Sequence, residues 1–236
     1  MPFGTLRRLL GGPANQPGSR GQQTRQKILA QALKIGAREG LGALTIGRLA
    51  EELGMTKSGL FAHFHSKRAL ELATLETARA VFDEGVLWPA QDSRAGLARL
   101  WTLCDLWLQH IEGRVFPGPY FFTGAFFQYA DRSGPVARAI MGIAKEWFQA
   151  LRKAVEEAQE REEMNPDADA KQVAWELNGQ LVGFYWAYLL ERGKSGREAR
   201  EVLLGKLRSL ATGQVPASAF ESVRAWKRYL KAQPQP

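Results

Sequence analysis

Apolar residues recur at every third or fourth position along most of this 236-residue chain, which predicts a series of amphipathic helices. No alternating strand pattern and no internal repeat stands out. Trp88-Pro89 is expected to end one helix, because proline restricts the residue before it. We therefore expect an all-α fold, with helices over residues 24–39, 45–53, 56–64, 66–86, 93–112, 120–130, 134–163, 169–192 and 197–211, and a short helix near 220–230.

The segment from Thr45 to Phe64, TIGRLAEELGMTKSGLFAHF, predicts two short helices joined by a tight turn. Thr45 and Thr56 are favourable N-cap residues for the two helices. Gly54 supplies the left-handed residue that commonly ends a helix. An apolar helix, a glycine turn and a short helix with small, basic and aromatic side chains describe a helix-turn-helix, whose second helix can enter the major groove of DNA.

The second helix carries side chains suited to DNA contact. Lys57 can reach a phosphate or a guanine edge, and Phe61 can touch a thymine methyl group or pack on a sugar. The backbone N–H groups of the first turn favour phosphate, and His63 can donate to one. Leu60 and Phe64 lie four residues apart on the other side, so we expect them to face the domain core.

The charge of the chain is concentrated beside this motif. Residues 1–68 contain 11 Lys and Arg against 3 Asp and Glu, whereas residues 69–236 contain 21 of each. The whole formal charge of +8 therefore lies in the segment with the helix-turn-helix. A basic segment beside a neutral one indicates a polyanion bound at one end of the chain.

From Thr24 to about Leu72 the chain resembles the DNA-binding domain of TetR/AcrR-family transcriptional regulators, through TRQKILAQALKIGAREGLGALTIGRLAEELGM and TKSGLFAHFHSKRALELA. The resemblance implies a two-domain all-α homodimer, in which one domain binds a palindromic operator and the other binds a ligand that releases it. Phe61 replaces a frequent tyrosine, Gly59 a common threonine, and His65 a small or basic residue. The resemblance implies DNA contacts at Thr45, Thr56, Lys57, Ser58, Gly59, Phe61, His63 and Lys67.

Composition and breaks in the pattern suggest four regions. Residues 1–20, rich in Gly and Pro with three arginines, are either a basic arm that follows DNA or a disordered start. Residues 21–68 form the DNA-binding domain, 69–212 a ligand-binding and dimerisation domain, and 213–236 a tail. No apolar run of about 18 residues suggests a spanning helix.

The neutral C-terminal segment is unusually aromatic, which favours an apolar ligand cavity with a few isolated polar groups. We expect this cavity between the helices that begin at Ser93, Tyr120, Gly134 and Asp169, and a ligand that is uncharged or weakly acidic. Gln128 and Gln180 are further polar candidates. The candidate ligand-binding residues are Trp101, Trp107, His110, Phe122, Phe126, Trp147, Trp175, Asn178 and Phe184.

Two helices at the end of the bundle are candidates for dimerisation. The 169–192 helix is apolar on more than one face, and the 197–211 helix follows it after a short turn. Two copies of each would make a four-helix interface, which a charge at Phe184 or Leu203 is expected to break.

The sequence predicts no cofactor and no metal site. His63 and His65 are two residues apart and do not share a helix face. Cys104, the single cysteine, excludes an internal disulfide and lies on an apolar helix face, which favours a buried, inert thiol.

Taken together, we expect a cytoplasmic, homodimeric DNA-binding regulator, a repressor that a small apolar or aromatic effector releases. An effector-independent, TetR-like architectural DNA-binding protein is one alternative. The other is an all-α enzyme that uses Cys104 or His110.

Overall fold

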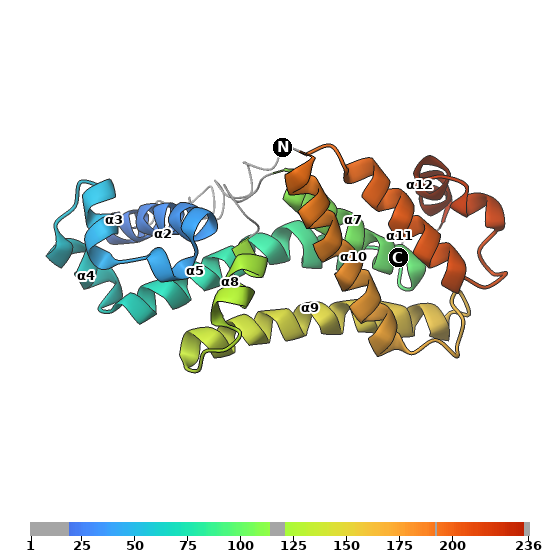
Figure 1. Cartoon of the computed structure of the whole chain (residues 1–236), viewed down its shortest axis with the longest axis horizontal. Coiled ribbons are helices and arrows are strands. Elements are labelled where there is room, and N and C mark those ends of the chain that lie inside the picture. The colour runs from blue at the N-terminus through green and yellow to red at the C-terminus, as the bar shows by residue number, and fades with distance from the viewer. Residues whose placement is uncertain (1–18, 114–120, 192, 234–236) are drawn as a thin grey trace. The chain divides into compact units, whose positions relative to one another are not determined.

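The computed structural model describes residues 19–113, 121–191 and 193–233 of the chain, and within these residues it is helical, without a strand (Figure 1). This confirms the all-α prediction. Most of the predicted arm, the aromatic residue Tyr120 and the end of the tail lie outside the described residues. The α-helices are α2 (Arg20–Glu39), α3 (Ile46–Glu52), α4 (Lys57–Phe64), α5 (Lys67–Phe82), α6 (Trp88–Gln91), α7 (Leu97–Glu112), α8 (Phe121–Tyr129), α9 (Pro135–Glu160), α10 (Ala170–Leu190), α11 (Gly196–Leu210) and α12 (Val223–Ala232).

The chain divides into two compact units. Unit 1 holds residues 1–84 and 113–145, and unit 2 holds residues 85–112 and 146–236. This division does not follow the boundary expected at residues 68 and 69, because α5 and α8 both pack against α2 inside unit 1.

Unit 1 is built around the apolar face of α2. Ile28, Leu29 and Leu33 on this helix are buried together with Leu70 of α5 and Phe121 of α8. The 3₁₀ turn η1 (Leu41–Ala43) joins α2 to α3. The core of unit 1 therefore contains a segment, α8, that lies far along the chain from the helix-turn-helix.

Local sequence signals define the helix starts in this unit. Ser19 caps α2 in a reciprocal capping box with Gln22, and Ser66 caps α5 through the backbone N–H of Ala69 at 3.0 Å. Side-chain oxygens at these positions satisfy N–H groups that have no partner within the helix.

The sequence predicted that the helix after the DNA-binding motif ends at Trp88-Pro89, but the helical backbone continues through this pair. A π-helical turn, η2 (Asp83–Leu87), follows α5, and α6 (Trp88–Gln91) begins directly after it. Pro89 lies in the first turn of α6, where the missing N–H group has no intrahelical partner to lose. The proline therefore starts a short helix instead of breaking a long one.

Unit 2 is a bundle in which α7, α10 and α11 pack on one another, with α12 and the 3₁₀ turn η3 (Ala217–Phe220) against α11. Arg200 on α11 donates to Asp105 at 2.5 Å and to Glu112 at 2.8 Å, both on α7. Glu163 accepts from the backbone N–H of Leu97 at 2.9 Å, at the start of α7. Charged groups removed from water are thus paired inside the bundle, as burial requires.

None of the helices among the described residues is both long and apolar enough to cross a membrane.

Candidate nucleic-acid interface and effector region

The helix-turn-helix has the predicted geometry. Thr45 caps α3, accepting from the N–H of Arg48 at 3.1 Å. Thr56 caps α4 in the same way, accepting from the N–H of Gly59 at 3.1 Å. Gly54 lies in the turn with φ of 62°, a left-handed value that suits glycine.

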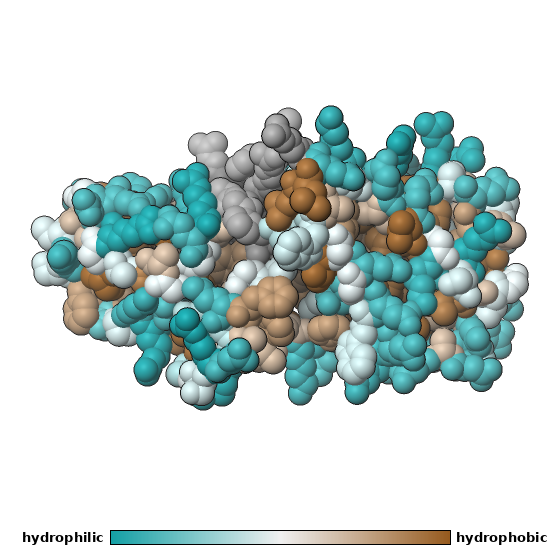
Figure 2. Space-filling view, in the orientation of Figure 1, coloured by the Kyte–Doolittle hydropathy of each residue, from teal (hydrophilic) through white to brown (hydrophobic). Residues whose placement is uncertain are grey.

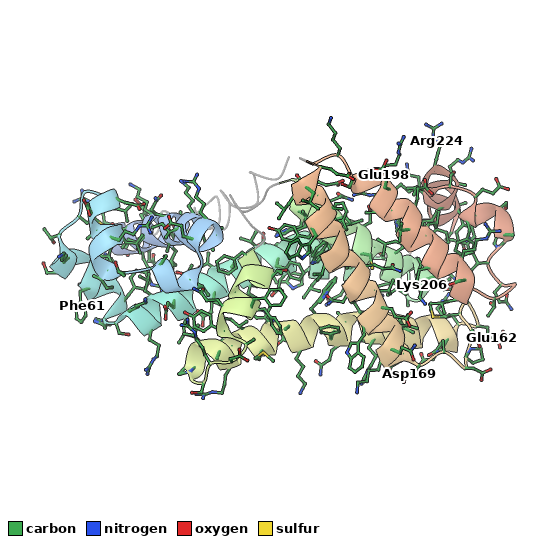
Figure 3. All side chains as sticks on the ribbon, in the orientation of Figure 1. Phe61, Glu162, Asp169, Glu198, Lys206 and Arg224 are labelled. Carbon is green, nitrogen blue, oxygen red and sulfur yellow. The ribbon has the colours of Figure 1, made fainter. Side chains whose placement is uncertain are left out.

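The two faces of α4 separate core residues from exposed ones. Leu60 and Phe64 are almost fully buried in the core of unit 1, as their spacing predicted. Phe61 is 50% exposed, so its ring is available on the outer face of α4. Phe61 is labelled in Figure 3, and its ring lies edge-on to that of His65, with centroids 6.1 Å apart. Exposed neighbours on this helix are Thr56, Lys57 and Ser58, while His63 is half-buried.

Lys57 is an available cation on this face. Its side chain passes over Gly47 of α3, so that a Cβ at Gly47 would lie 3.4 Å from Lys57 Cε. No ion pair or hydrogen bond joins its ammonium group to another side chain of the residues that the structure describes. Gly59 is packed closely against the cap, since a Cβ there would lie 3.0 Å from Thr56 Oγ1.

Lys67, also expected to contact DNA, is already engaged within unit 1. Its Nζ donates to the carbonyl oxygen of Gly42 at 2.7 Å and lies 3.7 Å from Glu71 Oε1. The side chain remains 47% exposed. Lys67 thus fastens the start of α5 to the η1 turn, and any phosphate would share this ammonium with the Gly42 carbonyl group.

A contact that the sequence did not reveal supports the same turn from the other side. Gln128 on α8 accepts from the N–H of Gly42 at 3.3 Å, and its amide lies against both Gly40 and Gly42. A Cβ at Gly42 would approach Gln128 Nε2 to 2.8 Å, and one at Gly40 would approach Oε1 to 2.9 Å. Tyr129, the next residue, donates to Glu71 Oε1 at 3.2 Å. We call the set Gly40, Gly42, Lys67, Glu71, Gln128 and Tyr129 the turn clamp.

Burial and the neighbouring Glu71 carboxylate raise the pKa of Tyr129 to about 12, so its hydroxyl stays protonated and remains a donor at neutral pH. The η1 turn that the turn clamp holds lies directly before the Thr45 cap of α3. Gln128 had been expected in a ligand cavity, and no local signal in the sequence places it on this turn.

The expected ligand-binding residues are divided between the two units. Phe122 and Phe126 belong to unit 1, where the Phe122 ring lies 5.6 Å from that of Phe82. Trp175 of unit 2 is 56% exposed, with the Lys171 ammonium group 4.7 Å above its ring. The other expected residues, Trp101, Trp107, His110, Trp147, Asn178 and Phe184, also belong to unit 2.

Several of the remaining candidates in unit 2 already have protein partners. Trp147 donates its indole N–H to Asn178 Oδ1 at 3.0 Å, so the amide expected to orient a ligand orients a tryptophan. Trp101 is buried with its ring 6.1 Å from that of Trp226, a residue of α12. Trp107 and Phe184 are also buried.

His110 is buried near the π-helical turn, where a Cβ at Gly85 would lie 3.6 Å from its Nδ1. Burial lowers the pKa of His110 to about 4, so the imidazole is neutral at physiological pH. Burial likewise raises the pKa of the Cys104 thiol to about 12, which makes Cys104 a poor nucleophile. Within the described parts of the chain, no three His, Cys, Asp or Glu side chains are grouped to hold a metal ion.

A groove of about 290 Å³ lies in unit 2 between α10 and α11, above Leu108 of α7. Phe184 lines it, and so does Gln180, which the sequence offered as a further polar candidate. The other lining side chains are mostly apolar and include Leu181, Ala187, Val202 and Leu203.

A basic helical unit with an exposed recognition-type helix, followed by a helical bundle, defines a helix-turn-helix regulator. Two family models match the chain: bacterial regulatory proteins of the tetR family over residues 28–74, and the tetracyclin repressor-like C-terminal domain over residues 96–202. The chain belongs to the TetR family of transcriptional regulators.

Solved structures share this fold. A TetR transcriptional regulator from Chloroflexus aurantiacus is 21% identical and has a TM-score of 0.73, over 81% of this chain and 98% of that one. A TetR-family regulator from Cytophaga hutchinsonii is 16% identical with a TM-score of 0.67, over 84% and 99%. AibR, in complex with isovaleryl coenzyme A and operator DNA, is 18% identical with a TM-score of 0.59, over 79% and 97%.

Proposed function

We propose that this chain is a cytoplasmic repressor that binds a palindromic operator as a homodimer and leaves it when a small apolar or aromatic effector binds unit 2. The observation that carries the proposal is the outer face of α4, which exposes Lys57 and Phe61 at the start and middle of a capped recognition-type helix. The solved structure of AibR, which shares the fold, holds both operator DNA and isovaleryl coenzyme A, which supports the proposal that one chain binds both DNA and an effector.

In this proposal Thr45, Thr56, Lys57, Ser58, Gly59, Phe61 and His63 form the DNA-contacting set. The threonines fix the N-termini of α3 and α4, where the helix dipoles favour phosphate. Lys57 supplies a mobile charge, and Phe61 an apolar surface for a sugar or a thymine methyl group. Lys67 acts mainly by holding the η1 turn.

The homodimer is supported by an exposed apolar stripe on α10. Trp175, Trp186 and Leu190 lie on its outer surface, and Val202 of α11 adds to the stripe. Figure 2 shows hydrophobic surface over these two helices. Such a surface is larger than an isolated exposed residue and favours an interface.

This stripe changes which residues should test dimerisation. Phe184 and Leu203 are buried within unit 2, so a charge at either position would unfold the unit instead of separating subunits. Trp186 and Leu190 are exposed and are better suited to the test.

The effector is proposed to be uncharged. The charged residues that line the α10–α11 groove are Glu191 and Glu198, which would repel an acid. The alternative, an architectural DNA-binding protein without an effector, is favoured by the existing partners of Trp101 and Trp147. Tryptophan quenching and operator release by the same compound would support the effector proposal.

A salt titration tests the DNA-binding proposal. Log affinity for the operator should fall with log salt, and Lys57→Ala should reduce the slope by about 0.9 if Lys57 contacts one phosphate. Lys171→Ala removes an exposed lysine from unit 2 and should leave affinity and slope unchanged. Equal effects of the two substitutions would contradict the proposed role of α4.

A further inference from the structure

The last helix of the chain has an unusual charge pattern. α12 carries four cationic residues and no acidic one, at Arg224, Lys227, Arg228 and Lys231. Their spacing of three, four and seven residues places them on one face of the helix. At 1.5 Å per residue this cationic stripe is about 10 Å long. The helix lies beyond the C-terminal family model, which ends at residue 202.

The opposite face of α12 is anchored by aromatic packing. Trp226 is fully buried, and its ring stacks on Phe220 at 5.0 Å and on Tyr229 at 5.4 Å. The Trp101 ring of α7 contacts it edge-on at 6.1 Å. Because these contacts fix the rotation of the helix, the cationic stripe faces solvent, and Figure 3 shows Arg224 extending away from the ribbon.

Most of the stripe is not used inside unit 2. Lys227 Nζ lies 3.4 Å from Asp105, a carboxylate that Arg200 already binds at 2.5 Å. Among the described residues, no ion pair or hydrogen bond of a side chain engages Arg224, Arg228 or Lys231. Three cations are therefore held at fixed spacing without a local counter-charge.

The surroundings indicate the kind of partner. Residues 193–233 contain 9 Lys and Arg against 3 Asp and Glu, so the stripe belongs to a basic region. The large exposed apolar residues of unit 2 all precede this helix, the last being Val202. Protein interfaces depend on exposed aromatic or apolar anchor residues, and interfacial membrane helices insert such residues into the lipid. Here Trp226 faces inward. Because α12 offers no apolar anchor to a protein or a membrane, we expect it to bind a partner by charge alone, as proteins bind a phosphate backbone.

We propose that the cationic stripe of α12 is a second DNA-binding surface, which contacts the phosphate backbone of double-stranded DNA without reading sequence. A 10 Å stripe laid parallel to the DNA axis covers a rise of about three base pairs, so it can contact phosphates of the backbone along that length. The inference extends the proposed function, because it adds to the helix-turn-helix a surface that would hold the protein on DNA outside the operator.

The test uses the full-length protein and a duplex that lacks the operator. The triple variant Arg224→Gln, Arg228→Gln, Lys231→Gln removes the three unpaired cations and keeps a good helix former at each position. The matched control, Arg152→Gln, Lys153→Gln, Lys194→Gln, removes three other exposed cations of unit 2 and changes the net charge equally. Circular dichroism checks that both proteins are folded, and fluorescence anisotropy measures binding across a salt series.

The α12 variant should lower the affinity and reduce the salt slope by about 0.9 for each phosphate that is no longer neutralised, while the control should match wild type. The α12 substitutions should cause the same loss of affinity when they are made in a Lys57→Ala protein. The two proposals can therefore fail separately, because each set of substitutions is measured with the other surface held constant. Equal losses in the two triple variants, or no loss in either, would overturn the inference. Competition by polyglutamate as strong as that by the duplex would also overturn it, in favour of an acidic protein partner.

Discussion

The turn clamp can be tested by adding one methyl group where Gln128 leaves no room. Gly42 is outside the left-handed region, so alanine is allowed there by its backbone. The new Cβ would lie 2.8 Å from Gln128 Nε2 and would force the amide away from the N–H that it now accepts from. Because the atom met is the far end of a flexible side chain, the amide can swing aside, and the expected cost is mainly the lost hydrogen bond, about 1 kcal/mol.

The same substitution should have the opposite sign once Gln128 is truncated. In a Gln128→Ala background the clash and the hydrogen bond are both absent, and Gly42→Ala should stabilise by about 0.4–1 kcal/mol through the unfolded state. Gly40 is the control, because its φ of 85° is left-handed. Gly40→Ala should therefore remain destabilising by about 1 kcal/mol even without Gln128.

Urea unfolding measures this cycle if the two units are followed separately. All seven tryptophans lie in unit 2, so their fluorescence reports that unit, whereas far-UV circular dichroism reports both. The change should appear in the dichroism transition and leave the fluorescence transition in place. Operator affinity should fall in Gly42→Ala and recover in the double variant, because the turn leads into the cap of α3. A cost of Gly42→Ala that is the same with and without Gln128 would refute the clamp.

Three further outcomes follow from the structure. Trp186→Asp should give folded monomers, as measured by light scattering. Met141 is also exposed but lies in unit 1, so Met141→Asp should leave the association state unchanged. A dimeric Trp186→Asp protein would exclude the α10 stripe as the interface. His110 has a pKa of about 4 in the folded protein and an ordinary value of 6.5, so the unfolded state binds the proton first as the pH falls. The unfolding free energy should therefore fall by up to about 3 kcal/mol between pH 6.5 and 4. The unfolding free energy of His110→Gln should depend less on pH in that window, and the same pH dependence in both proteins would contradict the burial of His110. Cys104 should react with a thiol reagent at pH 8 only after unfolding, and rapid labelling of the native protein would revive the enzyme alternative.

Local signals were sufficient to predict the helix-turn-helix. The caps at Thr45 and Thr56 and the left-handed Gly54 act within a few residues, so sequence spacing identifies them. The burial of Leu60 and Phe64 follows from the same spacing. The recognition-type surface of α4 was predictable because it depends on one short helix and not on its distant neighbours.

The contacts that were missed depend on tertiary packing. Gln128 meets Gly42 across 86 positions of the chain, and no periodicity encodes that pairing. The α10 helix is apolar on more than one face, so the sequence did not distinguish buried Phe184 from exposed Trp186. The resemblance implies a DNA contact at Lys67, and the sequence did not reveal that the Lys67 ammonium group also donates to the Gly42 carbonyl oxygen of the η1 turn.

Selection of genomic DNA fragments bound by the purified protein tests whether α4 reads an operator. We expect enrichment of one palindromic sequence, with half-sites about one helical turn or a whole number of turns apart, and loss of the enrichment in a protein that carries Lys57→Ala and Phe61→Ala. Bound fragments without a shared sequence, or enrichment that survives both substitutions, would contradict the assignment of α4 as the helix that reads the operator.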